Sequence, residues 1–200
     1  MYTFDNLVKN GSFEEPLGPG GEGPFNVYTA PNFGVGIPNW NLTAGSIDVF
    51  TSFASDGTQG IDTTGISTTI GGPGPGTLEQ SFQTVVGDFY QVSFDLSGGS
   101  EPAIKEIEVS ILDEITPIFS EVFTFDASSV PFVTFIEQNF SFVATSSSST
   151  IRFQSLVDQT SNGPYIDNVV VASKPVNEPL SLLSIFATIV FGVLLKRKNT

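Results

Sequence analysis

The chain has 200 residues, enough for one sizeable domain or for one domain with an appendage. It contains neither cysteine nor histidine, which excludes disulfides, thiolate chemistry, Cys/His zinc sites and any catalytic triad that needs histidine. Residues 1–177 carry 4 basic and 20 acidic side chains, a formal charge of 4 − 20 = −16, and such a surface repels nucleic acid.

The first long segment, residues 14–40, is rich in glycine and proline and predicts an ordered loop without helix potential. Tyr28 and Phe33 lie within it, and they could either line a ligand site at the rim of the domain or pin the loop to the body. Trp40, the only tryptophan, ends the segment. It could stack against a sugar, but its position beside a proline and just before a strand favours a core plug.

The second half of the body predicts strands. Residues 89–96 alternate, with tyrosine, valine, phenylalanine and leucine on one face and polar side chains on the other, as in a half-buried strand. Further strands are expected at residues 104–112, 118–125, 132–143, 150–156 and 166–171, with breaks at 117, 128–131, 146–149 and 161–164. Because no amphipathic helix interrupts this spacing, residues 1–173 predict a two-sheet antiparallel sandwich.

A cluster of carboxylates between residues 101 and 114 is the remaining candidate for catalysis, since glycosidases use two acidic side chains. Glu106 and Glu108 alternate with apolar residues, which places them on the solvent side of a strand. Charge at such a position protects a β-edge from aggregation. We therefore predict no catalytic residue and no enzymatic activity.

The C-terminal end of the chain has an apolar segment followed by basic residues. Residues 180–195 carry no charge, and as a helix they would be about 24 Å long, against about 30 Å for a hydrocarbon core. Lys196, Arg197 and Lys198 follow directly. By the positive-inside rule these residues stay in the cytoplasm, so that residues 1–177 lie outside. A buried core helix is the alternative, which a terminal apolar run capped by three charges fits poorly.

Asn177, Glu178 and Pro179 stand just before the apolar segment. The order of short motif, short spanning helix and basic end resembles the PEP-CTERM sorting signal of exosortase substrates, although Asn177 replaces the first proline of the usual motif. The resemblance implies that an exosortase cuts near Glu178 and releases the body or transfers it to a surface anchor. Without cleavage, the segment would be a single-span anchor.

These features predict three parts: the sandwich, a linker and sorting motif at residues 174–179, and a hydrophobic helix with a basic end at residues 180–200. The predicted location is the cell surface or the extracellular space. Because the residues after Met1 lack the apolar core of a signal peptide, we expect an export signal upstream of it.

The body resembles galactose-binding-like jelly rolls, which include carbohydrate-binding modules and the choice-of-anchor C family. Residues 6–14 (NLVKNGSFE), 37–40 (IPNW) and 163–171 (GPYIDNVVV) are similar to the opening, a middle element and the closing strand of that fold. Residues 45–49 and 60–62 are similar to its next two strands, and residues 78–82 and 87–96 to its central hairpin. The matches run in order over about residues 6–172.

This resemblance implies an all-β jelly roll that binds or organises extracellular polysaccharide without cleaving it. Two alternatives stay open: a structural component of the envelope or matrix with a protein partner, and a carboxylate-dependent glycan hydrolase. The expected partners are therefore a polysaccharide, an exosortase-type enzyme and, through the C-terminal helix, the membrane.

The resemblance also implies a calcium site. The first and last strands of such jelly rolls are close, and many members hold a structural calcium ion there. Carried over to this sequence, Glu14 and Asp167 become candidate ligands, with backbone carbonyls of residues 10–12. The alternative is that both are ordinary acids of a turn and a strand end.

Overall fold

The computed structural model describes residues 5–15, 25–34, 36–51, 53–99, 101–131 and 134–174. The predicted linker beyond residue 174, the apolar segment 180–195 and two groups of predicted functional residues lie outside these ranges. These groups are the sorting motif Asn177, Glu178 and Pro179 and the basic Lys196, Arg197 and Lys198. Among the described residues, no helix is long and apolar enough to span a membrane.

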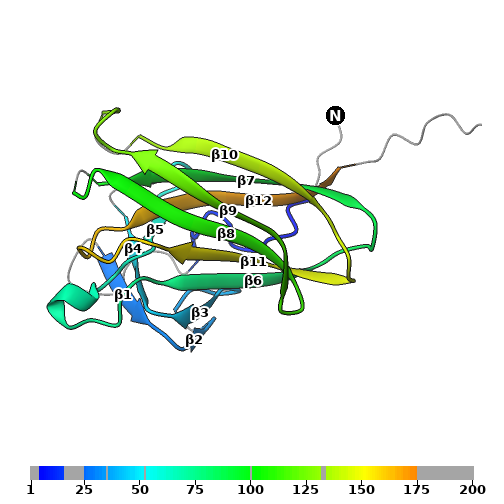
Figure 1. Cartoon of the computed structure of the whole chain (residues 1–200), viewed down its shortest axis with the longest axis horizontal. Coiled ribbons are helices and arrows are strands. Elements are labelled where there is room, and N and C mark those ends of the chain that lie inside the picture. The colour runs from blue at the N-terminus through cyan, green and yellow to red at the C-terminus, as the bar shows by residue number, and fades with distance from the viewer. Residues whose placement is uncertain are drawn as a thin grey trace, which may run out of the picture.

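The described residues form two six-stranded antiparallel sheets that pack face to face (Figure 1). In spatial order, sheet A contains β1 (Phe25–Thr29), β4 (Ser46–Phe50), β5 (Gly60–Asp62), β12 (Pro164–Lys174), β7 (Phe89–Gly98) and β10 (Ile136–Val143). Sheet B contains β2 (Asn32–Phe33), β3 (Asn41–Ala44), β6 (Thr77–Gln83), β11 (Ser148–Ser155), β8 (Ile104–Asp113) and β9 (Thr116–Asp126). A single 3-10 turn, η1 (Thr68–Ile70), lies between β5 and β6. The predicted all-β, two-sheet jelly-roll sandwich is confirmed.

The core lies between the sheets and is built by alternation along the strands. In β7, every second side chain from Tyr90 to Leu96 is buried, as the sequence predicts. Phe94 is fully buried and meets Phe123 and Phe153 of sheet B edge to face, with ring centroids 5.2 Å apart in both pairs. Such aromatic pairs add to the stability gained from burial alone.

Two predicted features of the first half differ in the structure. The segment 14–40 is not wholly a loop, because β1 and β2 lie within it and pair with β4 and β3. Residues 78–82 and 87–96 do not form a hairpin, because β6 belongs to sheet B and β7 to sheet A. The connection between β6 and β7 crosses from one sheet to the other. The order of the strands along the chain does not show which sheet each strand joins.

Two predicted breaks in the second half also lie inside strands. Pro117 belongs to β9, an edge strand, and is paired with Leu112 just beyond a register shift, a place where a proline is tolerated. The turn lies instead at residues 114–115, where Glu114 has a φ of 56°. Ser149, predicted as part of a break, is buried in β11.

The N-terminal segment runs along β12 and brings the two ends of the domain together. The Leu7 backbone N–H donates to the Val171 carbonyl at 2.8 Å, and the Asn6 side chain bonds both Val169 and Val171. The Val169 N–H donates in turn to the Gly11 carbonyl at 2.9 Å. The predicted closeness of the first and last segments is confirmed.

Candidate functional site

A row of side chains crosses sheet A on the face turned away from the core. The strand register places Val27 opposite Asp48, Asp48 opposite Asp62, and Asp62 opposite Tyr165. Directly opposed residues of antiparallel strands share one face of the sheet. The neighbouring Ile47 and Ile61 are fully buried in the core on the opposite face. Two carboxylates therefore lie side by side on the outer face.

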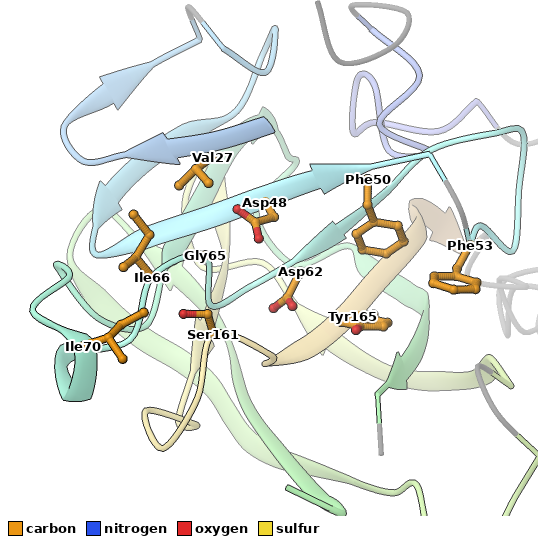
Figure 2. A pocket seen from close by; sticks show the side chains of 10 residues that line it. All are labelled: Val27, Asp48, Phe50, Phe53, Asp62, Gly65, Ile66, Ile70, Ser161 and Tyr165. Carbon is orange, nitrogen blue, oxygen red and sulfur yellow. The ribbon is translucent and has the colours of Figure 1, made fainter. Parts of the chain in front are cut away.

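This face carries a pocket of about 530 Å³, a volume typical of small-molecule sites. Figure 2 shows the two carboxylates between three aromatic rings on one side and three aliphatic side chains on the other. The rings are Phe50, Phe53 and Tyr165, and the aliphatic residues are Val27, Ile66 and Ile70. Gly65 and Ser161 complete the lining.

Asp48 is 9% exposed, and its Oδ1 atom is buried without a hydrogen-bond partner. Burial raises the pKa of this carboxyl from 3.8 to about 7. Gly65 lies close to it, since a Cβ at that position would be 3.0 Å from Asp48 Oδ1 and 2.8 Å from the Ile47 backbone. A glycine at this position thus lets the backbone pass close to the Asp48 carboxyl, where any larger residue would be crowded against that oxygen.

Asp62 is more completely held by the protein. Its Oδ1 accepts hydrogen bonds from the backbone N–H groups of Thr64 and Gly163, both at 2.8 Å. Burial raises the pKa of this carboxyl well above its usual value, the two N–H donors oppose that shift, and the neighbouring Asp48 adds to it. The pocket therefore contains one anchored carboxyl and one with a buried oxygen that no donor of the described residues satisfies.

The three rings form one wall. Phe50 lies with its ring centroid 4.9 Å from that of Tyr165 and 6.3 Å from that of Phe53. The Tyr165 hydroxyl donates to the Asn162 side chain at 2.8 Å, and burial raises the pKa of Tyr165, which keeps the hydroxyl protonated. Phe50 and Phe53 come from β4 and from the loop that follows it.

The structure places Trp40 away from this pocket. Trp40 is 1% exposed, and its ring packs against Phe13 and Phe153 with centroids at 5.3 and 6.1 Å. Its Nε1–H donates to the Asn10 carbonyl at 3.0 Å. Protein covers the whole indole, so of the two roles predicted for Trp40 the structure has the core plug, and the ring offers no face to a sugar.

Tyr28 does not join the pocket either. Tyr28 lies opposite Ile47 on the core side of β1 and is half-buried against the core. Its ring lies over Gly36, where a Cβ would be 2.2 Å from a ring carbon, an arrangement that corresponds to pinning of the loop. Phe33 is the last residue of β2, and its side chain lies outside the described part of the chain.

Glu14 and Asp167 are brought to one loop, residues 53–59. Glu14 Oε1 accepts from the backbone N–H groups of Thr58 and Gln59 at 2.7 and 2.6 Å, and Oε2 accepts from the Thr58 hydroxyl at 2.8 Å. Asp167 Oδ2 accepts from the Ser55 N–H, the Ser55 hydroxyl and the Asp56 N–H at 2.7, 3.1 and 3.0 Å. The two acids thus hold successive parts of the loop that carries Phe53: Asp167 its middle and Glu14 its end.

This arrangement does not fit a calcium ion, which takes six to eight oxygen ligands. The oxygens of both carboxylates are engaged by N–H and O–H donors. The Asn10 carbonyl accepts from Trp40 and the Gly11 carbonyl from Val169. Across the described ranges, no group of three or more acidic, histidine or cysteine side chains could hold a metal.

We therefore expect a calcium chelator to leave the thermal midpoint of the full chain unchanged, since an ion bound only to the folded state would raise it. A midpoint that falls with chelator and recovers with added calcium would instead establish a metal site at Glu14 and Asp167. Glu14→Gln is the matched control: it weakens the contacts with Thr58 and Gln59, so the midpoint should fall equally with and without chelator.

Sequence reasoning missed Asp48 and Asp62 altogether. Both follow an isoleucine within a short strand, and in each pair the isoleucine enters the core while the acid faces outward. That repeated Ile-Asp pair is the signal that could have found them. The acids between residues 101 and 114 were the candidates for catalysis that the sequence offered. Of these, Glu106 is exposed on the outer face of sheet B, as its alternation with apolar residues predicts.

The family model described as "Protein of unknown function (DUF642)" matches residues 6–172. A comparison with curated proteins finds no match.

Solved structures give matches to the fold. The module TmCBM61, in complex with beta-1,4-galactotriose, has a TM-score of 0.51 at 14% identity, over 85% of this chain and 99% of that one. The CBM22-1 xylan-binding domain of Paenibacillus barcinonensis Xyn10C has a TM-score of 0.51 at 12% identity, over 86% of this chain and 97% of that one. The arabinose-bound α-L-arabinofuranosidase MgGH51 has a TM-score of 0.54 at 10% identity, over 85% of this chain but only 26% of that one.

Proposed function

The chain belongs to the DUF642 family, and we propose that this member is a non-enzymatic domain that binds polysaccharide in the pocket on sheet A. The observation that carries the proposal is the Asp48 carboxyl, whose buried Oδ1 has no hydrogen-bond partner among the described residues and which lines the same pocket as three aromatic rings. Sugar rings pack their apolar faces on aromatic side chains and donate their hydroxyls to carboxylates. The names of two structures with this fold, a galactotriose-bound module and a xylan-binding domain, support the same function.

The carboxyl pair suits binding better than hydrolysis. A glycosidase needs one protonated and one ionised carboxyl, in environments that push their pKa values apart. Here burial raises the pKa of both Asp48 and Asp62. Asp62 is also only 5% exposed and is bonded to two backbone N–H groups, so it is poorly placed to attack a sugar. Incubation with the producer's own exopolysaccharide should therefore release no reducing ends.

Export to the cell surface is part of the same proposal, together with membership of the choice-of-anchor C group. It is supported by the order of motif, apolar segment and basic end at the C-terminus. Mass spectrometry of the protein recovered from the producing cells tests it. A mature chain that ends near Glu178 would indicate exosortase-type cleavage, and a cytoplasmic full-length chain would refute export.

Phe53→Ala should weaken the binding of oligosaccharides at least about 10-fold, a loss of about 1.4 kcal/mol. Phe53 supplies an outer ring of the aromatic wall from a loop, so its truncation removes contact area with little effect on the core. Titration calorimetry against galacto- and xylo-oligosaccharides measures the change.

Ile115→Ala is the control for Phe53→Ala, because Ile115 is 89% exposed in the turn between β8 and β9 and does not line the pocket. Equal losses in the two variants would place the sugar elsewhere. Self-association of the chain without retention on any polysaccharide would favour a structural component with a protein partner.

A further inference from the structure

The polar side chains that line the pocket are two carboxyls and two hydroxyls, those of Asp48, Asp62, Ser161 and Tyr165. Asp48 Oδ1 has no donor, and Asp62 faces the pocket beside it. The Tyr165 hydroxyl donates away from the pocket, to Asn162. Ser161 Oγ accepts from the Ser67 N–H at 3.1 Å. An ionised Asp48 carboxylate is an acceptor only, so a ligand that brings hydrogen-bond donors satisfies the oxygen that the described residues leave without a partner.

Among the described residues that line the pocket, none is cationic and able to balance the two carboxyls. A positive charge that acts on Asp62 belongs to Lys105, which is fully buried. Its ammonium donates to the carbonyls of Asn162 and Glu101 at 2.6 and 3.1 Å and takes no part in the lining. The ion pair found within the described residues, Arg152 with Glu79, lies on sheet B.

The walls favour an organic cation over a metal ion. Calcium and magnesium require a shell of oxygens, whereas this pocket has three aromatic rings and three aliphatic side chains around two carboxyls (Figure 2). An ammonium group is attracted to aromatic faces and carries three N–H donors and no acceptor. It also compensates the charge of a buried carboxylate, whose burial without a partner is costly.

We infer that the pocket on sheet A takes a protonated amine carried by a sugar, so that its ligand is a polysaccharide with free 2-amino groups. The inference rests on the proposed function and specifies the class of glycan. The Asp48 carboxyl receives the ammonium, and Phe50, Phe53 and Tyr165 supply the aromatic wall beside it. The strongly acidic body of the chain concentrates such cationic polymers at its surface.

The test is titration calorimetry of the full chain near neutral pH with glucosamine oligosaccharides and with their N-acetylated counterparts of the same length. We expect the free-amine oligosaccharides to bind at least about 10-fold more tightly. Asp48→Asn should abolish this preference while its thermal midpoint stays at or above that of the wild type. Glu106→Gln, which removes one exposed carboxylate on sheet B, should keep the preference and thereby excludes a general charge effect.

Other results separate the two proposals. If acetylated or neutral oligosaccharides bind as well as the amines, the amino-sugar inference is overturned and polysaccharide binding stands. If no oligosaccharide binds, both fail. If a linear polyamine without sugar binds as tightly as the amino-sugar oligosaccharide, the site recognises amines but the assignment to a glycan is overturned.

Discussion

Replacement of Trp40 by alanine is expected to lower the free energy of unfolding by about 3–5 kcal/mol. The indole is 1% exposed, contacts the rings of Phe13 and Phe153, and donates a hydrogen bond to Asn10. Truncation would leave a cavity where the N-terminal segment meets the core, and it would leave the Asn10 carbonyl with one donor fewer. Urea unfolding of the full chain measures the loss.

Trp40→Phe should recover part of the stability that Trp40→Ala loses, because it keeps an aromatic ring in the core and loses only the N–H donor. A loss of stability below about 1 kcal/mol in Trp40→Ala, together with a loss of glycan binding, would contradict the core-plug role and make Trp40 a ligand contact.

Asp48→Asn is expected to raise the free energy of unfolding by roughly 2–4 kcal/mol at about pH 8. The pKa of this carboxyl is 3.8 in its ordinary state and about 7 in the folded chain. At a pH between these two pKa values, the folded state keeps a proton that the unfolded state has lost. The free energy of unfolding therefore falls as the pH rises through this window and stays low above it. The amide carries no charge and should remove this fall.

The measurement is the free energy of unfolding of the wild type and Asp48→Asn, followed from acid to mildly alkaline pH. The two curves should converge below the ordinary pKa of aspartate and separate as the pH approaches 7. Glu106→Gln, in which the carboxylate lost is exposed, should follow the wild type at every pH. Parallel curves for wild type and Asp48→Asn would show that Asp48 is ionised without penalty and therefore solvated.

The fold of the second half could be predicted because its strands are long and half-buried. In β7, for example, alternation determines which side chains enter the core, and Phe94 takes its predicted place. The strands β4 and β5 have five and three residues, all buried on both faces, so they show little alternation. The sequence shows that such segments are strands but not which of their faces is covered.

The site could not be predicted because it depends on pairing. Asp48 and Asp62 are separated by the loop that carries Phe53, and only the register of β4 with β5 places them side by side. Tyr165 joins them from the far end of the chain through β12. A single sequence gives residue types and local period, but the choice of neighbouring strand comes from the packing of the whole sandwich.

The most direct test of polysaccharide binding on sheet A is a crystal structure of the full chain with a bound glucosamine or xylo-oligosaccharide. We predict one sugar ring against Phe50 and Phe53, with a donor of the ligand within hydrogen-bond distance of the Asp48 carboxyl. Sugar bound to the outer face of sheet B, with the sheet A pocket unoccupied, would contradict the account.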